Sequence, residues 1–217
     1  MMDGSSTVFV VDDDPSVLRG IERLLRSAGF RTQVYPSAQA FLCGHRRDAL
    51  GCVILDLAMP GLDGLQVQQQ LLEGEGVLPI IFLTAHGDVR SSVQAMKQGA
   101  VDFLLKPVDE EELLAAVRRA VERCVALRRA QREVAVFEER LATLTRREHE
   151  VLGHLLSGKL NKQIAASLGT VEKTIKVHRS RIMQKMGSPT LVNLVRLAER
   201  AGVTPAYGQS ARGSTAL

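Results

Sequence analysis

The sequence predicts an α/β domain with a doubly wound, five-stranded parallel sheet, followed by a long helix and a small all-α domain. The first half alternates five short β-rich runs with five helical segments, which is typical of a parallel sheet covered on both faces. From Thr145 onward, only short helical segments follow. The charge differs between the halves, since residues 1–121 carry 11 Lys and Arg against 16 Asp and Glu, and residues 122–217 carry 17 against 8.

Caps and turn residues mark most elements of the first half. Pro15 opens a helix that Gly29 ends, Ser37 caps the second helix, Gly99 ends the fourth and Asp109 caps the fifth. The strands are expected at Thr7–Val11, Thr32–Tyr35, Cys52–Leu55, Ile80–Leu83 and Val101–Leu105. The middle helices are expected over 37–42, 64–72 and 89–98. We expect the strand order 2-1-3-4-5, as in flavodoxin-like folds, with the functional site at the carboxyl ends of the strands.

The fifth helix has no breaker until about Leu144. Its apolar residues are spaced by 4, 3, 4 and 3 positions, at Leu113, Val117, Ala120, Cys124 and Leu127. This spacing allows two interpretations, either a coiled coil with a partner helix or a first part that packs on the sheet followed by a charged linker.

Four helices are predicted in the second half. Thr145 caps the first in a capping box with Glu148, and Asn161 caps a short second helix. The third spans Glu172–Met186, and the last spans Thr190–Ala201. The predicted limits are therefore 5–122 for the α/β domain, 123–143 for a helical linker, 144–204 for the all-α domain and 205–217 for a flexible tail.

The composition excludes several classes of protein. Apolar residues make up 45% and charged residues 24%, so the chain is not disordered throughout. No apolar run is long enough for a membrane span, and the N-terminus lacks the pattern of a secretory signal. The three cysteines, Cys43, Cys52 and Cys124, form no metal or redox spacing and are expected to be small buried hydrophobic residues. We therefore expect a cytoplasmic protein without disulfides.

Acidic residues follow two strands that neighbour each other in the expected order. Asp12 and Asp13 leave the first strand, and Asp56 ends the third. Two bare charges about 4 Å apart repel by roughly 4 kcal/mol at an effective dielectric of 20, so the site favours a cation. Hard oxygen ligands with room for water suit Mg²⁺.

Two further polar residues end the remaining central strands. Thr84 follows the fourth strand and Lys106 follows the fifth. A carboxylate nucleophile, a divalent cation, a hydroxyl and an ammonium group together form a site for a phosphoryl group. Taken singly, an Asp after a strand is more often a helix cap, and a Lys before Pro is more often solvated.

These motifs resemble a response-regulator receiver domain over about residues 5–122. The resemblance rests on Asp12-Asp13, the run from Leu55 to Gly64, Thr84-Ala85 and Lys106-Pro107. It implies that Asp56 accepts a phosphoryl group from a sensor histidine kinase and that Lys106 pairs with the phosphate. It also implies that the peptide bond before Pro107 is cis. It also implies Mg²⁺ ligation by Asp13, Asp56 and the carbonyl of Ala58, with Asp12 acting through water.

The same resemblance implies a switch pair and a gating position. Thr84 and Phe103 match the pair that rearranges when the domain is phosphorylated; the alternative for Phe103 is a plain core aromatic residue. His86 matches a position that gates access to the pocket, or is an ordinary loop histidine.

The basic second half predicts a helix-turn-helix. Residues 161–168, 169–171 and 172–186 form a helix, a tight turn and a longer helix of the kind that enters the major groove. On the longer helix Ile175, His178, Ile182 and Met186 form the inward face. The outward side carries Lys173, Lys176, Val177, Ser180, Arg181 and Gln184. The alternative without DNA binding is a helical bundle with a solvated basic face.

This half resembles the LuxR-type helix-turn-helix, and the whole chain is similar to FixJ/NarL-type regulators, most of all to the FixJ type. The resemblance rests on 144–148, 161–165 and 174–178, with Ile182 and 185–186. It implies that Lys176, Val177 and Ser180 read bases, with Ser180 departing from the basic residue of some relatives. Lys162, Lys173 and Thr174 would contact phosphate, and Arg181 faces the same side.

The expected function is a two-component transcription regulator. The expected partners are a histidine kinase, a second copy of the chain after phosphorylation, double-stranded DNA with two half-sites and, as a candidate, RNA polymerase. One alternative is a DNA-binding protein that acts without phosphorylation. Another is a phosphatase with an aspartyl intermediate, which lacks its general acid because Ala58 stands two residues beyond Asp56.

Overall fold

The computed structural model describes residues 6–46, 49–74, 78–85 and 89–203. They divide between two compact units, Met1–Arg129 and Ala130–Leu217. The predicted tail, 205–217, lies outside the described residues. Among the described helices, none is long and apolar enough to cross a membrane.

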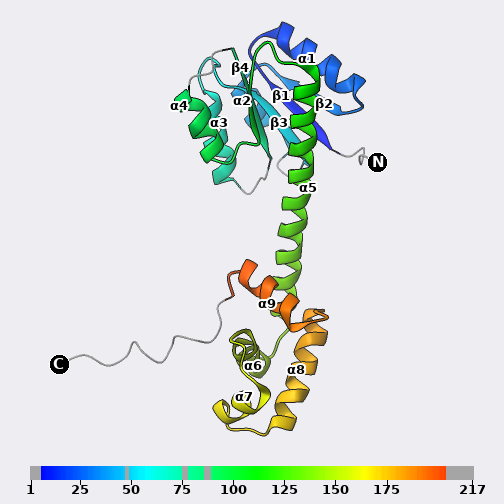
Figure 1. Cartoon of the computed structure of the whole chain (residues 1–217), viewed down its shortest axis with the longest axis vertical. Helices are drawn as coiled ribbons and strands as arrows, with labels where there is room; N and C mark the ends of the chain where they lie inside the picture. Colours follow the sequence, from blue (N-terminus) through cyan, green and yellow to red (C-terminus); the bar gives the residue numbers. More distant parts are fainter. Residues whose placement is uncertain (1–5, 47–48, 75–77, 86–88, 204–217) are drawn as a thin grey trace, which may run out of the picture. The chain divides into compact units, whose positions relative to one another are not determined.

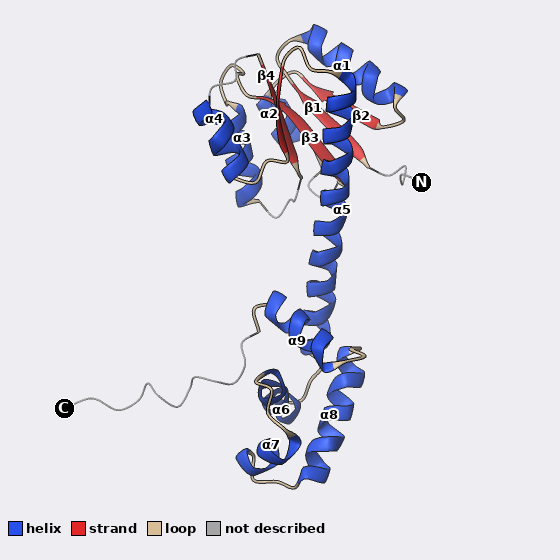
Figure 2. Ribbon diagram, in the orientation of Figure 1, coloured by secondary structure: helices blue, strands red, loops and turns tan. Residues whose placement is uncertain are grey.

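The first unit contains a five-stranded parallel sheet in the order β2-β1-β3-β4-β5, which confirms the predicted fold class (Figures 1 and 2). The strands are β1 (Thr7–Val11), β2 (Arg31–Tyr35), β3 (Gly51–Asp56), β4 (Ile80–Thr84) and β5 (Asp102–Leu105). The helices are α1 (Pro15–Ser27), α2 (Ala38–Gly44), α3 (Gly64–Glu73), α4 (Val89–Lys97) and α5 (Glu110–Leu141).

Alternate residues of the central strands enter two separate cores. Val8 and Val10 of β1 face α1 and α5, whereas Phe9 and Val11 face α2 and α3. This alternation follows from the period of two along a strand. Because both faces are covered, β1, β3 and β4 are buried almost throughout, as their continuous apolar runs predict.

The second unit contains the end of α5 and four shorter helices. These are α6 (Arg146–Leu156), α7 (Asn161–Ser167), α8 (Glu172–Met186) and α9 (Leu191–Arg200). Thr145 and Glu148 form the predicted capping box at the start of α6. Gly187 ends α8 with φ of 59°, a left-handed conformation that favours glycine.

Two predictions about individual residues are wrong. Asn161 does not cap α7 but is its first residue, and the capping position belongs to Leu160, which has no side-chain acceptor. Gln163 compensates in part, because its side-chain oxygen accepts from the Leu160 N–H at 2.8 Å. Cys43 is exposed rather than buried, because the short helix α2 directs it away from the core, while Cys52 and Cys124 are buried as predicted.

The apolar stripe of α5 divides between the two units. Leu113, Val117, Ala120 and Cys124 are buried in the first unit, against the sheet. Phe137 is buried instead in the core of the second unit. The early part of the stripe therefore packs on the sheet, as the interpretation with a charged linker predicts.

Candidate phosphoryl-acceptor site and nucleic-acid interface

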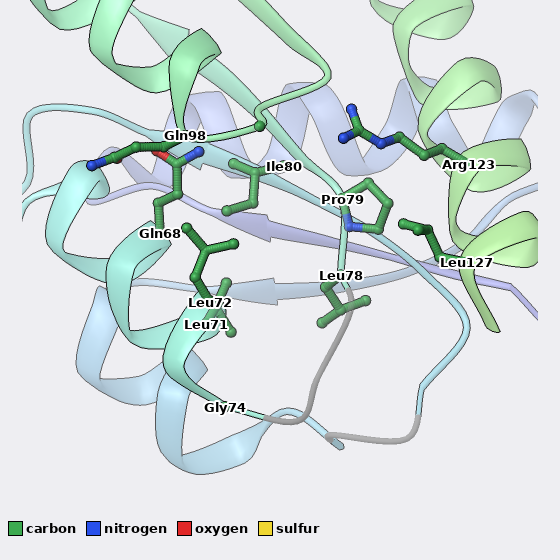
Figure 3. Close-up of a pocket in the computed structure, with 11 residues that line it drawn as sticks. Gln68, Leu71, Leu72, Gly74, Leu78, Pro79, Ile80, Gln98, Arg123 and Leu127 are labelled. Carbon is green, nitrogen blue, oxygen red and sulfur yellow. The ribbon is translucent and has the colours of Figure 1, made fainter. Parts of the chain in front are cut away.

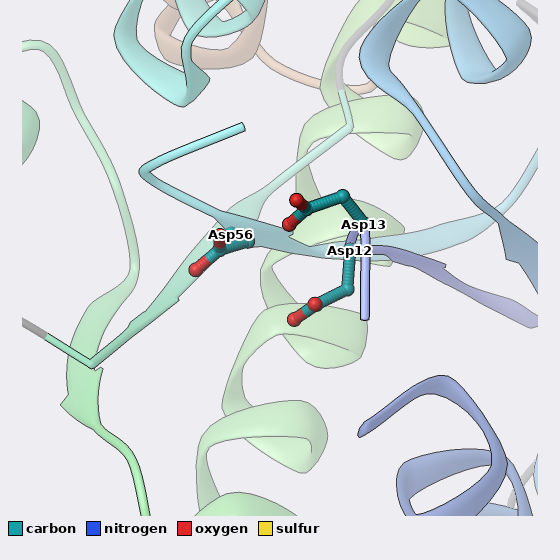
Figure 4. A group of neighbouring side chains, drawn as sticks. All are labelled: Asp12, Asp13 and Asp56. Carbon is teal, nitrogen blue, oxygen red and sulfur yellow. The ribbon is translucent and has the colours of Figure 1, made fainter. Parts of the chain in front are cut away.

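The structure brings the three predicted carboxylates together at the carboxyl ends of β1 and β3. Asp12 and Asp13 follow β1 and Asp56 ends β3, and one oxygen of each lies within 4.8 Å of the others (Figure 4). The parallel pairing of β1 with β3 accounts for this, because it places Val11 beside Leu55. Asp12 and Asp56 are buried, whereas Asp13 is exposed. One edge of the sheet thus collects the acids from two strands, and these three residues form the acidic cluster.

Lys106 neutralises part of this charge. Its Nζ lies 2.6 Å from Asp12 Oδ2 and 3.1 Å from Asp56 Oδ1. Burial raises the pKa of Asp56, while the hydrogen bond and charge of Lys106 act in the opposite direction. Burial alone would lower the pKa of Lys106, but its contacts with the two carboxylates outweigh burial and raise it. The ammonium group is therefore charged and lies next to Asp56 Oδ1.

The peptide bond between Lys106 and Pro107 is cis, as the resemblance implies. The Lys106 N–H donates to the Thr84 carbonyl oxygen at 2.8 Å, so the end of β4 holds the start of the loop that carries Lys106.

The predicted switch residues lie on adjacent strands. Thr84 is buried at the end of β4, one residue beyond Leu83, which pairs with Asp56. Phe103 pairs with Phe82 across β4 and β5, and their ring centroids are 6.1 Å apart. The Phe103 ring is partly buried against the core formed with α2, α3 and α4. His86 lies outside the described residues.

The donor set fits a small divalent cation. One carboxylate oxygen from each of the three residues lies within 4.8 Å of the other two, and the exposed Asp13 leaves the site open toward solvent. Such hard oxygen donors with space for water are the surroundings that Mg²⁺ prefers. Ala58 is exposed two residues after Asp56, in the connection to α3.

A separate cavity of about 260 Å³ is not part of this site (Figure 3). It lies between the end of α3, the start of β4 and α5, at the opposite end of β4 from Thr84. Its described lining contains no acidic residue, and its walls include Leu71, Leu78 and Ile80. It therefore offers no carboxylate for a cation.

The second unit presents the predicted helix-turn-helix. On α8, Ile175, Ile182 and Met186 are buried, and His178 is half-buried. The exposed residues of the opposite side are Lys173, Lys176, Val177, Ser180, Arg181 and Gln184. Lys162 on α7 is also exposed, and Thr174 is partly buried. The side that the sequence assigns to DNA is thus accessible.

Sequence reasoning missed the polar contacts that fix the helices of this unit. Lys185 Nζ lies 2.7 Å from Oε2 of the buried Glu148, which also accepts from the Thr145 N–H at 2.8 Å. Arg147 donates to the Leu168 carbonyl oxygen at 2.8 Å, next to the turn between α7 and α8. Because the Lys185–Glu148 and Arg147–Leu168 contacts join residues at least 21 positions apart, no local pattern in the sequence signals them, whereas the Thr145–Glu148 capping box was predicted.

The sequence matches two protein families. Residues 8–118 match the response regulator receiver domain, and residues 142–198 match the LuxR family of bacterial regulatory proteins. The response regulator protein TodT of Pseudomonas putida is 44% identical over 200 residues, which cover 92% of this chain and 88% of TodT. The transcriptional regulatory protein FixJ of Bradyrhizobium diazoefficiens is 38% identical, with 90% and 96% covered.

Solved structures agree with these matches. The response regulator StyR has 45% identity and a TM-score of 0.75, and the match covers 90% of this chain and 99% of StyR. The expected resemblance to FixJ/NarL-type regulators is thus confirmed, although TodT and StyR share more identity with the chain than this FixJ does.

Proposed function

Because the chain belongs to the response regulators that join a receiver domain to a LuxR-type DNA-binding domain, we propose that phosphorylation of Asp56 controls its dimerisation and its sequence-specific binding to DNA. The observation that carries this proposal is the contact of Lys106 with both Asp12 and Asp56 in the acidic cluster. This arrangement holds one carboxylate oxygen of Asp56 beside a positive charge, at the open end of the sheet.

The acidic cluster would hold Mg²⁺ during the reaction. Asp13 and Asp56, with the carbonyl of Ala58, would be its direct ligands, and Asp12 would act through water. The ion would neutralise phosphoryl oxygens, which lowers the repulsion that a carboxylate nucleophile meets.

Asp56 is the proposed acceptor. One of its carboxylate oxygens attacks the phosphorus of a phosphohistidine on the kinase, forming a P–O bond while the P–N bond breaks, and the imidazole leaves with that electron pair. The product on this chain is an acyl phosphate. Lys106, already 3.1 Å from Asp56 Oδ1, would follow the new negative charge and pair with a phosphate oxygen.

Thr84 and Phe103 would couple phosphorylation at the acidic cluster to a change at the surface of the domain. The Thr84 hydroxyl would move toward the phosphate, and the Phe103 ring would turn into the space beside it. This coupling requires that phosphate favours one of two states, since a ligand shifts an equilibrium only by its differential affinity. The surface of α4 and β5, where Val89 and Leu105 are exposed, would then bind a second copy.

DNA binding would follow from pairing of the two copies. A dimer presents two α8 helices to two half-sites, and linked sites bind more tightly through effective concentration. Lys176, Val177 and Ser180 would read bases, while Lys162 and Thr174 would contact phosphates. Lys173 would also contact phosphate, and Arg181 would lie on the same basic side. RNA polymerase would be the further partner at a promoter.

The test combines Mg²⁺ and acetyl phosphate with a measurement of molar mass by light scattering. We expect the phosphorylated chain to shift toward the dimer, and the same sample to bind a promoter fragment more tightly. Asp56→Asn is the control and should show neither change. Tight, specific DNA binding that is equal with and without acetyl phosphate would instead support the regulator that acts without phosphorylation.

A further inference from the structure

The last turns of α5 are part of the DNA-binding unit. Phe137 is 2% exposed and belongs to the same core as Ile182 of α8, and Leu141 packs against that core. Both residues precede the LuxR-family match, which begins at residue 142, and follow the receiver match, which ends at 118. A segment that lies outside both family matches therefore contributes to the core beneath the recognition helix.

Arg140, on the same segment, contacts the carboxyl end of α8. Its Nη1 donates to the carbonyl oxygen of Met186, the last residue of α8, at 2.9 Å. Carbonyl groups in the last turn have no partner within their own helix, and this end carries partial negative charge. The guanidinium therefore supplies both a donor and a complementary charge.

Gly187 leaves room for this contact. A Cβ at this position would lie 2.2 Å from Nη1 and 2.8 Å from Cζ of Arg140, so the guanidinium lies directly against the glycine backbone. Glycine at position 187 thus accommodates the left-handed φ and leaves space for the guanidinium group of Arg140. Lys185 holds the same end of α8, because its Nζ donates to the Thr143 carbonyl oxygen at 3.1 Å.

The anchored end is remote from the residues assigned to base reading. Lys176 precedes Met186 by ten positions, which is about 15 Å along a helix. A tilt of about 10° about the anchored end would move a residue at that distance by about 2.6 Å. Hydrogen bonds to base edges do not tolerate such a shift, because their donor–acceptor distances span only about half an ångström.

We propose that Arg140 is a positioning residue, which fixes the angle of the recognition helix by holding its carboxyl-terminal carbonyl. This inference rests on the proposed function, in that it requires α8 to read DNA. Arg140 acts through α8 and not through a contact of its own with DNA, so its loss should reduce discrimination between sequences more than general affinity for DNA.

The test uses the full-length chain with Mg²⁺ and acetyl phosphate. A duplex is first selected from a random pool by the wild-type chain, and a scrambled duplex of equal composition serves as the non-specific probe. Dissociation constants for both are then measured over a salt series for Arg140→Ala and for Arg132→Ala. Arg132 is exposed on the same helix and is the matched control. Titration of the active fraction restricts each value to folded protein.

We expect Arg140→Ala to bind the selected duplex about tenfold more weakly than Arg132→Ala does. This loss corresponds to the free energy of one charged hydrogen bond. The affinity of Arg140→Ala for the scrambled duplex and its salt slope should equal those of Arg132→Ala. Equal affinity of the two variants for the selected duplex would overturn the proposal. So would an equal loss on both duplexes with a salt slope shallower by about 0.9, which indicates a direct phosphate contact.

A conservative variant keeps the test decisive if Arg140→Ala does not fold. Arg140→Lys retains one donor and the charge, and we expect a loss of about threefold relative to Arg132→Lys, less than the full charged hydrogen bond. No difference between these two lysine variants would overturn the proposal. Failure of the wild-type chain to select any duplex would contradict the proposed DNA binding itself, which distinguishes the two failures.

Discussion

The ion pair between Glu148 and Lys185 gives a quantitative prediction for the stability of the DNA-binding unit. The hydrogen bond from Lys185, followed by that from the Thr145 N–H, lowers the pKa of Glu148 from 4.5 to about 2. At about 1.36 kcal/mol per pH unit, a difference of about 2.5 units corresponds to about 3 kcal/mol in favour of the folded state. The Lys185 side chain is 35% exposed, so solvent screens part of this energy and we expect about 1 to 3 kcal/mol.

The pH dependence of this stabilisation follows from the lowered pKa of Glu148. Because the folded state lowers the pKa of Glu148, the stabilisation is fully present above pH 4.5. It is lost as the pH falls from about 4.5 to about 2, where the carboxylate takes up a proton. Glu148→Gln removes the charge but keeps an oxygen for the Thr145 N–H, so it should lower the free energy of unfolding at pH 7 by the same 1 to 3 kcal/mol.

Hydrogen exchange followed by mass spectrometry measures this local stability in the full-length chain. Peptides from α6 and α8 should exchange faster in Glu148→Gln at pH 7, and peptides from the receiver sheet should not change. Glu139→Gln, at an exposed position on α5, is the matched control. Protection in Glu148→Gln equal to that in Glu139→Gln, or a carboxyl carbon of Glu148 that titrates near pH 4.5 by NMR, would refute the reasoning.

Three further predictions concern the same unit. Val171 occupies the N-cap of α8 without a side-chain hydrogen bond, so Val171→Ser should stabilise the unit by about 1 kcal/mol, measured by thermal unfolding. Lys176→Ala should weaken binding to a selected duplex by about 1–3 kcal/mol and relax the preference for one sequence, and unchanged specificity would contradict the groove assignment. Affinity should fall about 10³- to 10⁵-fold between 50 and 200 mM salt if six to ten phosphates are contacted, and a flat salt response would contradict DNA binding.

The fold of the first unit could be predicted because its signals are local. Strands β1, β3 and β4 are short apolar runs that end at a polar residue, and helix starts are marked by residues such as Pro15, Ser37 and Asp109. The convergence of Asp12 with Asp56 followed from strand order alone, since neighbouring parallel strands end at one edge of a sheet. The cap of α7 was missed because Asn161 favours a capping position by type, while the backbone begins its helix one residue earlier.

The contacts that hold the recognition helix could not be predicted in the same way. Arg140 and Met186 are 46 positions apart, and both a charged residue on a long helix and a methionine at a helix end are common. The packing of Phe137 and Leu141 into the second core places this part of α5 beside α8. Before the structure, Arg140 was one of several arginines in a predicted linker.

The most direct test of the account is the affinity of the full-length chain for a selected DNA duplex, measured before and after phosphorylation at Asp56. Acetyl phosphate with Mg²⁺ should add one phosphoryl group, localised to Asp56 by mass spectrometry after borohydride reduction, and should lower the dissociation constant for the duplex. Asp56→Asn should remain unmodified and keep the lower affinity. A phosphoryl group on another residue, or an affinity that is the same for both forms of the wild-type chain, would contradict the account.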